Sequence, residues 1–442
     1  MQNPWSWMTV CGLLLSVHGA AMAAEADWAS ADKVAEVEAG ERTEAHASWW
    51  GFDEEDSTAY LQAAIDSGVE KLVIPKMDSP WIVEPIELTQ DNQTLVFEQG
   101  AVVKAKEGSF RGRGDCLFSA SNRRNLALIG YGAMLEMRKE EYWEEPYEEA
   151  EWRHALAIRG SSNVTVAGLT LRRSGGDGIY LGVTGANNVN EDVVIREVVC
   201  DENHRQGLSV ISARNLRVEN SMFNHTVGTA PQSGIDLEPN NPDEELTNVV
   251  IRNCVFQDNE RTGMHMWLGK MNEESEPVSV TWENNYVRGG DIGIHCGNAE
   301  GVQGSIEYRG NIVENTRYAG IFLREKAHDT ARLTVEDLVL HDVAMEDSED
   351  YGWPSAPIVL HGSRGEQFPQ QGGIELKRIL VRQTRELNRP VFQTTARQGF
   401  EEWRDVTGSI FVNVPGEFDT DIVNAGKDFD VRVNPVEDVL PQ

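Results

Sequence analysis

Residues 232–238 read QSGIDLE, in which a glycine is followed by alternating apolar and acidic residues, the pattern of a strand with one buried face. The same pattern recurs in GDGIYLG (176–182), RQGLSVI (205–211), RTGMHMW (261–267), DIGIHCG (291–297) and YAGIFLR (318–324). The aligned glycines are residues 178, 207, 234, 263, 293 and 320, so the steps are 29, 27, 29, 30 and 27. A repeat of this length without helical periodicity predicts coils of short strands stacked on one another.

A second set of strands lies between these segments. Each begins with apolar–polar alternation, breaks at a turn residue such as Asn220, Asn253 or Asn284, and then resumes. The set comprises NVTVAGLTL (163–171), DVVIREVVC (192–200), NLRVENSMF (215–223), NVVIRNCVF (248–256), SVTWENNYV (279–287), SIEYRGNIV (305–313) and RLTVEDLVL (332–340). The two sets together predict an all-β chain folded as a right-handed parallel β-helix, because the blades of a propeller need about 40 residues or more.

The N-terminal part carries a family resemblance. DSTAYLQAAIDSG (56–68), KLVIP (71–75) and NQTLVFEQGAVVKA (92–105) resemble the capping helix and first coils of the pectate-lyase-like superfamily. APIVLHG (356–362) and GIELKRILVRQ (373–383) continue the strand pattern toward the C-terminus. The resemblance implies a solenoid with an N-terminal capping helix and a carbohydrate as the class of ligand, without implying one activity.

We expect three segments: a signal peptide over residues 1–23, an N-terminal segment over 24–50, and a single β-helix domain over 51–442 with an irregular C-terminal tail. Residues 1–23 carry no charge and end in small residues, as secretory signals do. A secreted protein, periplasmic or extracellular, is therefore expected. The formal net charge of −33 argues against nucleic acid and an anionic membrane surface as partners.

The cysteines show no metal-type spacing, and Cys116, Cys200, Cys254 and Cys296 are expected to be buried apolar residues, with a disulfide left open. No metal or cofactor is expected, although a structural calcium ion is compatible with the sequence. The oligomeric state is left open.

The second residue after each glycine must point away from the coil interior, because the first and third are apolar in all six copies. This column reads Tyr180, Ser209, Asp236, His265, His295 and Phe322. A carboxylate and a histidine on neighbouring rungs, about 4.8 Å apart, are suited to acid–base chemistry near neutral pH.

The candidate catalytic residues are Asp236, Glu238, Asp177, His265 and His154. The candidate substrate-binding residues are His204, Arg205, Trp267, His295 and Arg324, in which the cationic side chains suit a sulfate or carboxylate and the indole suits a sugar ring. The acidic and aromatic insertion at 138–154 is expected to fold over the same face and form a wall of the binding groove.

These residues favour a polysaccharide-degrading glycoside hydrolase acting on an anionic glycan, such as a sulfated algal polymer like fucan. Residues two apart on one strand face are about 6.6–6.8 Å apart at the backbone, which fits an inverting carboxyl pair of Asp236 and Glu238. Asp177 or a histidine base could also supply the second role. A polysaccharide lyase or uronate epimerase is the main alternative, and a carbohydrate-binding solenoid without catalysis is another.

Overall fold

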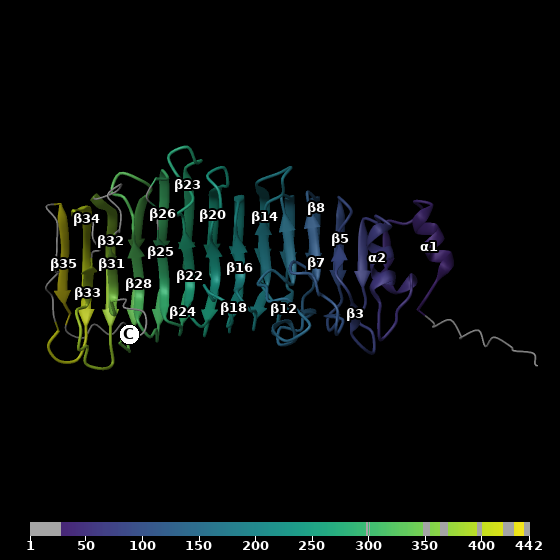
Figure 1. Ribbon diagram of the computed structural model, residues 1–442, viewed down its shortest axis with the longest axis horizontal. Coiled ribbons are helices and arrows are strands. Elements are labelled where there is room, and N and C mark those ends of the chain that lie inside the picture. The colour runs from purple at the N-terminus through teal and green to yellow at the C-terminus, as the bar shows by residue number, and fades with distance from the viewer. Residues whose placement is uncertain are drawn as a thin grey trace, which may run out of the picture.

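The computed structural model describes residues 28–297, 299, 301–347, 354–362, 370–395, 400–418 and 428–436. Its strands pair in parallel and stack along one long axis, with the helices gathered at the N-terminal end (Figure 1). Each coil contributes strands to two sheets, so that the residues between the sheets form one continuous core.

Among the described residues, the first sheet has 11 strands and contains the aligned glycine segments, so we call it the glycine sheet. Its strands, in spatial order, are β4 (Ile86–Glu87), β7 (Phe118–Ser121), β10 (Leu156–Arg159), β13 (Ile179–Gly182), β16 (Gln206–Val210), β19 (Ser233–Leu237), β22 (Thr262–Trp267), β25 (Ile292–Gly297), β28 (Ala319–Arg324), β31 (Ala356–His361) and β33 (Phe392–Thr395).

The second sheet has 24 strands in the described ranges, and these strands run as two rows. The first row is β1 (Glu44–His46), β2 (Lys71–Ile74), β5 (Gln93–Phe97), β8 (Arg124–Ile129), β11 (Ser162–Ala167), β14 (Asn190–Arg196), β17 (Ala213–Glu219), β20 (Leu246–Arg252), β23 (Val278–Glu283), β26 (Gly304–Arg309), β29 (Arg332–Glu336), β32 (Gln370–Arg382), β34 (Glu402–Asn413) and β35 (Phe429–Pro435). The second row is β3 (Trp81–Val83), β6 (Val102–Ala105), β9 (Met134–Glu136), β12 (Thr170–Arg172), β15 (Val199–Asp201), β18 (Met222–Asn224), β21 (Val255–Gln257), β24 (Tyr286–Arg288), β27 (Ile312–Glu314) and β30 (Val339–His341).

The repeated glycines are explained by close packing between coils. A Cβ atom on Gly207 would lie 2.5 Å from the carbonyl oxygen of Gly234, and one on Gly234 would lie 2.8 Å from that of Gly263. Gly178 and Gly293 face the next glycine carbonyl in the same way, each at 2.7 Å. No side chain fits at such distances, so the glycine is a steric requirement of the stack.

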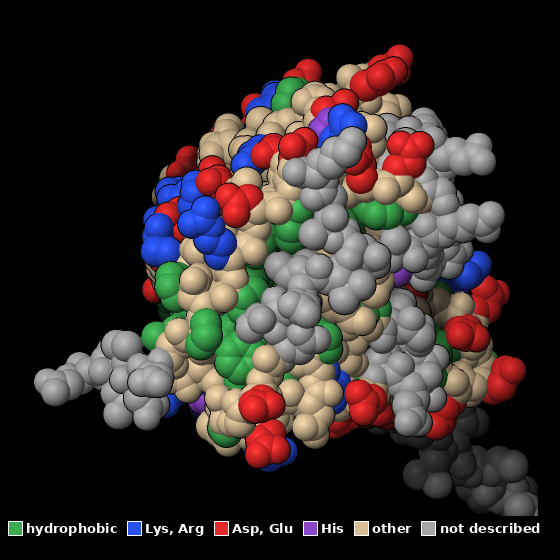
Figure 2. All heavy atoms as spheres, turned by 90° about the vertical axis from the view of Figure 1, so that its left-hand side faces the viewer, with side chains coloured by type: hydrophobic (Ala, Val, Ile, Leu, Met, Phe, Trp, Pro, Cys, Tyr) green, Lys and Arg blue, Asp and Glu red, His purple; other side chains and the backbone are tan. Residues whose placement is uncertain are grey.

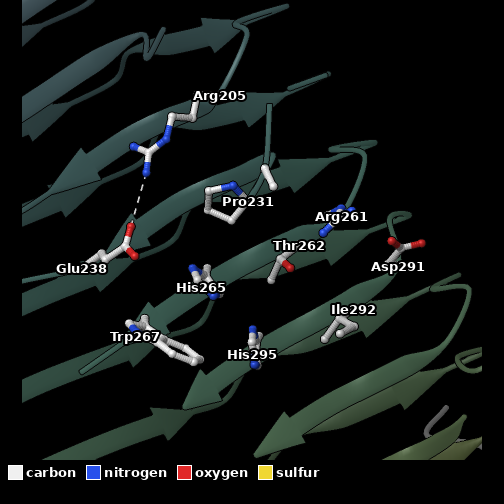
Figure 3. Close-up of a pocket in the computed structure, with 11 residues that line it drawn as sticks. Arg205, Pro231, Glu238, Arg261, Thr262, His265, Trp267, Asp291, Ile292 and His295 are labelled. Carbon is white, nitrogen blue, oxygen red and sulfur yellow. Dashed lines mark hydrogen bonds and ion pairs between the residues drawn. The ribbon is translucent and has the colours of Figure 1, made fainter. Parts of the chain in front are cut away.

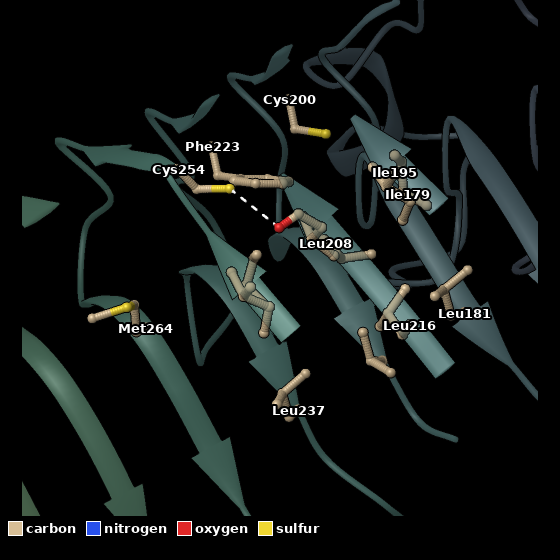
Figure 4. Packing of buried hydrophobic residues seen from close by; sticks show 14 of the residues in the cluster. Ile179, Leu181, Ile195, Cys200, Leu208, Leu216, Phe223, Leu237, Cys254 and Met264 are labelled. Carbon is tan, nitrogen blue, oxygen red and sulfur yellow. Dashed lines mark hydrogen bonds between the residues drawn. The ribbon is translucent and has the colours of Figure 1, made fainter. Parts of the chain in front are cut away.

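The core consists of the apolar residues that the alternation predicts. The first and third residues after each glycine are buried, among them Ile179, Leu208, Leu237 and Met264 (Figure 4). They pack against second-sheet residues such as Leu216. Cys116, Cys200, Cys254 and Cys296 are all buried and free, as expected for small apolar residues.

The predicted turns between strands are formed by asparagines in the left-handed backbone region. Asn220, Asn253 and Asn284 have φ values of 54°, 53° and 53°, a conformation that asparagine tolerates better than most residues. The Asn253 amide donates a hydrogen bond to the Asn220 side-chain oxygen one coil away. These turns repeat with the coil and keep the strands in register.

The predicted capping helix is confirmed. Helix α2 (Thr58–Asp66) buries Leu61, Ala64 and Ile65 against the first coils. The Gln93 side chain donates to the Ile65 carbonyl oxygen, which helps satisfy the C-terminal end of α2.

Further N-terminal elements precede residue 51. They are α1 (Ala31–Glu38), β1 and the 3-10 helix η1 (Ala47–Trp49); a second 3-10 helix, η2 (Glu141–Trp143), lies in the insertion. Strand β1 pairs with β2, so strand pairing begins earlier than the expected domain boundary at residue 51. The expected signal peptide at 1–23 lies outside the described residues.

Candidate functional site

A pocket of about 320 Å³ opens over strands β19, β22 and β25 of the glycine sheet. Figure 3 shows side chains from these strands and from the turns before them converging on it. Its lining residues are Arg205, Ala230, Pro231, Glu238, Arg261, Thr262, His265, Trp267, Asp291, Ile292 and His295. Five of the ten residues singled out from the sequence therefore meet in one cavity: Arg205, Glu238, His265, Trp267 and His295.

The predicted column is confirmed by the strand register. Asp236 pairs with His265, and His265 pairs with His295. The column points away from the coil interior but is not open to solvent, because Asp236 is fully buried and His265 and His295 are 7% and 6% exposed. Side chains from the turns before the strands, including Arg205 and Pro231, line the same pocket as His265 and His295 (Figure 3).

Asp236 and His265 form a hydrogen-bonded pair. His265 Nδ1 lies 2.7 Å from Asp236 Oδ1, and Gln206 Nε2 donates to Asp236 Oδ2 at 3.0 Å. Gln206 is fixed in turn, because its own side-chain oxygen accepts from the Ser233 backbone N–H. Since Nδ1 faces a carboxylate, it carries the proton and leaves Nε2 as the basic nitrogen of the ring. Asp236 itself does not line the pocket, so it orients His265.

Glu238 and Asp236 are in direct contact, but their environments separate their pKa values. Burial and the negative charge of Asp236 raise the pKa of Glu238 to about 7, against the opposing effect of Arg205. Burial also raises the pKa of Asp236, but the charge and hydrogen bond of His265 outweigh it and hold this pKa below its ordinary value. Near neutral pH, Asp236 is therefore a carboxylate and Glu238 retains a proton for much of the time.

The sequence leaves open whether Glu238 merely caps the turn that follows it. In the structure Glu244 fills that role, because it accepts hydrogen bonds from the backbone N–H groups of Asn240 and Asn241. The carboxyl group of Glu238 is therefore available to the pocket, where it faces Arg205.

Asp177 and His154 lie together, as their shared column predicts, but outside the pocket lining. His154 Nδ1 accepts a hydrogen bond from the Asp177 backbone N–H at 3.0 Å and lies 3.2 Å from its Oδ2. Both side chains are 1% exposed or less, and the His154 ring stacks on Tyr180. Neither residue can reach a polysaccharide in this arrangement.

His204 and His295 are not the cations that an acidic substrate would require. Burial lowers the pKa of His204 to about 4, and burial with nearby His265 and Arg324 lowers the pKa of His295 well below its ordinary value. The His204 ring is stacked on Trp143, at 4.0 Å between centroids, and its Nε2 contacts Thr229 Oγ1. The expectation that these two histidines supply positive charge is therefore wrong, because burial keeps both neutral.

Trp267 lines the pocket, and Arg324 lies against it. The Arg324 guanidinium carbon is 5.1 Å from the centre of the Trp267 ring, and its Nη2 is 2.6 Å from Glu325. Arg324 is thus occupied by a cation–π contact and an ion pair and does not line the pocket.

The insertion at 138–154 lies beside the site, but none of its residues lines the described pocket, as the expected groove wall would. Trp143 stacks on His204, Tyr142 is buried, and Arg153 pairs with Gly175 in an antiparallel bridge. The insertion also supplies Glu151, whose carboxylate lies 3.7 Å from Arg205. It therefore packs over the N-terminal side of the site.

Sequence reasoning missed Gln206, Glu151 and Arg261. The alignment carried a signal for Arg261, because RQG and RTG both place an arginine two residues before the glycine. Gln206, like Asp177, is the residue before the repeated glycine. Its hydrogen bond to Asp236 becomes visible only in the side-chain geometry. Glu151 lies in an insertion that no repeat aligns, so its position could not be predicted.

Within the described ranges, no group of three or more histidine, cysteine or acidic side chains is arranged to hold a metal ion. The helices of the same ranges include none that is long and apolar enough to cross a membrane.

Comparisons with known proteins agree with this architecture. The family model described as "Right handed beta helix region" matches residues 154–337. The uncharacterized protein YclG of Bacillus subtilis (strain 168) is 30% identical over 121 residues, which are 25% of this chain and 21% of YclG. The chain thus aligns with about a fifth of that relative.

Three solved structures share the fold at low identity. A family 28 exopolygalacturonase of Yersinia enterocolitica is 14% identical with a TM-score of 0.60, over 89% of this chain and 78% of its own. A GH87 α-1,3-glucanase of Streptomyces thermodiastaticus is 15% identical with a TM-score of 0.54, over 89% and 69%. The tailspike of Escherichia coli bacteriophage HK620, solved with a hexasaccharide, is 15% identical with a TM-score of 0.57, over 84% and 71%. These matches confirm the predicted fold, a right-handed parallel β-helix.

Proposed function

We propose that this right-handed parallel β-helix protein is a polysaccharide-degrading enzyme, a glycoside hydrolase in which Glu238 is the general acid and His265 the general base. One observation supports the proposal most strongly: Glu238, whose pKa is raised to about 7, lies in the same site as His265, which is hydrogen-bonded to the buried carboxylate of Asp236. Both Glu238 and His265 line the same pocket. Such a pair can donate and accept a proton at neutral pH.

The proposed reaction is a single displacement. Glu238 gives its proton to the glycosidic oxygen as the bond to the anomeric carbon breaks. Water attacks that carbon from the opposite face, and His265 Nε2 takes the proton that the water loses. Asp236 stabilises the resulting imidazolium through the hydrogen bond to Nδ1, and the configuration at the anomeric carbon inverts.

The contact between Asp236 and Glu238 supports His265 as the base. An inverting pair needs about 6.5–9.5 Å between the two groups to hold the attacking water. Asp236 and Glu238 are hydrogen-bonded to each other, which leaves no room for a water between them. We therefore propose Asp236 as a positioning residue, in place of the direct catalytic role expected from sequence. The buried His154 and Asp177 are proposed as structural residues.

Two proteins of this fold are named as an exopolygalacturonase and an α-1,3-glucanase. Polysaccharides are therefore the first substrate class to test. Within that class we propose an anionic glycan, sulfated or uronate-containing, because Arg205 and Arg261 both line the pocket. Trp267 would stack on a sugar ring. A polymeric substrate also suits an exported protein, for which residues 1–23 would be the signal.

A lyase is the second candidate, and the two pocket arginines favour it specifically. They would neutralise a uronate carboxylate while His265 removes the C5 proton, the C4–C5 double bond forms, and the oxygen that leaves C4 takes a proton from Glu238. Hydrolysis creates new reducing ends without unsaturation, whereas elimination creates a product that absorbs ultraviolet light.

The test is a panel of sulfated, uronate and neutral polysaccharides in which both products are followed. We expect new reducing ends without ultraviolet-absorbing product on at least one anionic polymer. Unsaturated product would establish the lyase instead. Binding without either product would establish a carbohydrate-binding solenoid, and activity on neutral polymers alone would contradict the anionic substrate.

A further inference from the structure

Arg205 lies between two carboxylates that hold it loosely. Its Nη2 is 3.3 Å from Glu238 Oε2 and its Nε is 3.7 Å from Glu151 Oε2. Both distances exceed the 2.7–2.9 Å usual for a hydrogen bond between charged groups. Nε is buried and has no hydrogen-bond partner within the described part of the chain. The guanidinium therefore has donor capacity that neither partner uses.

The surroundings of Arg205 are strongly acidic. Asp177 and Asp236 act on its charge together with Glu151 and Glu238. Asp177 is fully buried, and neither of its carboxylate oxygens has a hydrogen-bond partner among the described residues. These charges keep Arg205 at the pocket wall without fixing its guanidinium in a bidentate pair. An acidic group that enters the pocket could offer that bidentate geometry.

We propose that Arg205 recognises an acidic group of the sugar, a carboxylate or a sulfate ester, and that it exchanges its partners Glu238 and Glu151 for that group when substrate binds. The proposal rests on the proposed function, since it assigns the substrate class and the control of the same site. Arg205 acts here as a specificity-determining residue that also frees Glu238 to react.

The exchange changes the protonation of Glu238. In the free protein the charge of Arg205 opposes the burial and the Asp236 charge that raise the pKa of Glu238 to about 7. When Arg205 moves to an anion, this opposing effect is lost, and the anion itself favours the protonated acid. Binding of an acidic sugar near pH 7 is therefore accompanied by proton uptake, and the general acid is fully protonated only in the complex.

The other charged and titratable groups around Glu238 are Asp236 and His265 on the glycine sheet, Asp177 and Glu151 on the N-terminal side, and Arg261 and Asp291 on the opposite wall. Within the described residues, Arg205 is the group that forms the ion pair with Glu238. Arg205 is therefore the group whose movement changes the titration of Glu238 most directly.

Glu151 gives the proposal a second, opposite prediction. It competes with the substrate for Arg205, so Glu151→Gln should bind acidic sugars more tightly, whereas Arg205→Gln should bind them more weakly. A purely structural role for the two residues would weaken binding in both variants.

The experiment measures proton uptake when the protein is mixed with saturating glucuronate, glucose sulfate or glucose in weakly buffered solution at pH 7. We expect up to about half a proton per protein molecule with at least one acid, since the pKa of free Glu238 is about 7. We expect none with glucose, and none for Arg205→Gln or Glu238→Gln. Arg214→Gln is the matched control and should behave as the wild type, because Arg214 also pairs with two glutamates, Glu191 and Glu245, but lies outside the pocket.

Three results would overturn the inference: neither acid binds better than glucose, no acid that binds causes proton uptake, or the uptake persists in Arg205→Gln. If hydrolysis is lost in Glu238→Gln while the wild type shows no uptake, the proposed function stands and this inference falls. If uptake occurs as expected but no glycosidic bond is cleaved, the pocket binds acidic sugars and the proposed hydrolase falls.

Discussion

Asp236 on β19 and Glu238 directly after it carry two carboxyl groups that are in contact but favour opposite protonation states. Asp236 points to His265 and Gln206 and is ionised, whereas Glu238 sits against Asp236 in a half-buried position that favours its protonated form. When the pKa values of two neighbouring carboxyl groups differ, one can be protonated and the other ionised at the same pH. Here the protonated Glu238 can act as the acid, and the ionised Asp236 can position the base His265.

The pH dependence of the reaction follows from Glu238. Its pKa is raised to about 7, and a general acid works only when protonated. We expect kcat/KM to fall tenfold per pH unit above about pH 7. The measurement is the pH profile of kcat/KM over the whole range in which the protein is stable. A kcat/KM that rises through pH 7 would show that Glu238 does not act as the acid.

Asp236→Asn should separate a positioning role from a structural one. An amide at this position accepts less strongly from His265 Nδ1–H and can turn its own N–H toward the ring, so the basic tautomer is lost. We expect kcat to fall about 10²-fold or more with KM nearly unchanged.

The checks on Asp236→Asn are the circular dichroism spectrum and the melting temperature, together with Asp236→Glu as the conservative variant. Partial rescue of kcat by glutamate is expected, because it restores a carboxylate. A KM that rises as much as kcat falls would indicate a disturbed pocket and contradict the positioning role.

The sequence could predict these residues but not their states. The column of Asp236, His265 and His295 follows from alignment, and the register confirms it. Burial of that column depends on side chains from turns, and turns vary between coils. The neutral state of His204, held between Trp143 and Thr229, depends on an insertion that the repeat does not contain.

At the scale of the elements, the glycine sheet depends on contacts that leave no space for a methyl group. A Cβ atom on Gly207 would lie 2.5 Å from the Gly234 carbonyl oxygen and 2.9 Å from the Phe223 ring. We expect Gly207→Ala to lower the free energy of unfolding by about 1–3 kcal/mol, the usual cost of overpacking. Denaturant titration followed by tryptophan fluorescence measures it.

Gly185→Ala is the control for this change, because a Cβ atom there would meet nothing within 4 Å. It should leave the denaturation midpoint unchanged. Equal effects of the two substitutions would show that the loss of glycine flexibility, and not the close approach of coils, causes the destabilisation.

Most elements could be predicted because their pattern repeats. The alternation fixes which side of each strand is buried, and helix α2 was marked by its apolar face at the N-terminal end of the solenoid. The short elements α1 and β1 lie outside the repeat, so no internal comparison could identify them.

At the scale of the whole molecule, the net charge of −33 surrounds a site that we propose for an anionic polymer. Acidic side chains are spread over the end of the molecule shown in Figure 2, with no single acidic patch. The attraction exerted by Arg205 is local, whereas the repulsion extends as far as ionic screening allows. The Debye length falls from about 30 Å at 0.01 M salt to about 10 Å at 0.1 M.

We therefore expect kcat/KM on an acidic polysaccharide to rise between about 0.01 M and 0.1 M salt, because the long-range repulsion is screened before the contact with Arg205. A neutral polysaccharide that is turned over should show no such change. A steady fall in kcat/KM for the acidic polymer across this range would show that attraction to pocket cations outweighs the net charge.

The most direct test of the account compares reducing-end release and polysaccharide binding for the wild type, Glu238→Gln and Glu219→Gln on the best substrate of the panel. Glu219 is a matched control, because it is also paired with an arginine, Arg252 at 2.7 Å, but lies on β17 away from the pocket. We expect Glu238→Gln to lose about 10²- to 10⁴-fold in kcat while it still binds the polymer, and Glu219→Gln to cleave as the wild type does. Cleavage by Glu238→Gln at the wild-type rate would contradict this expectation.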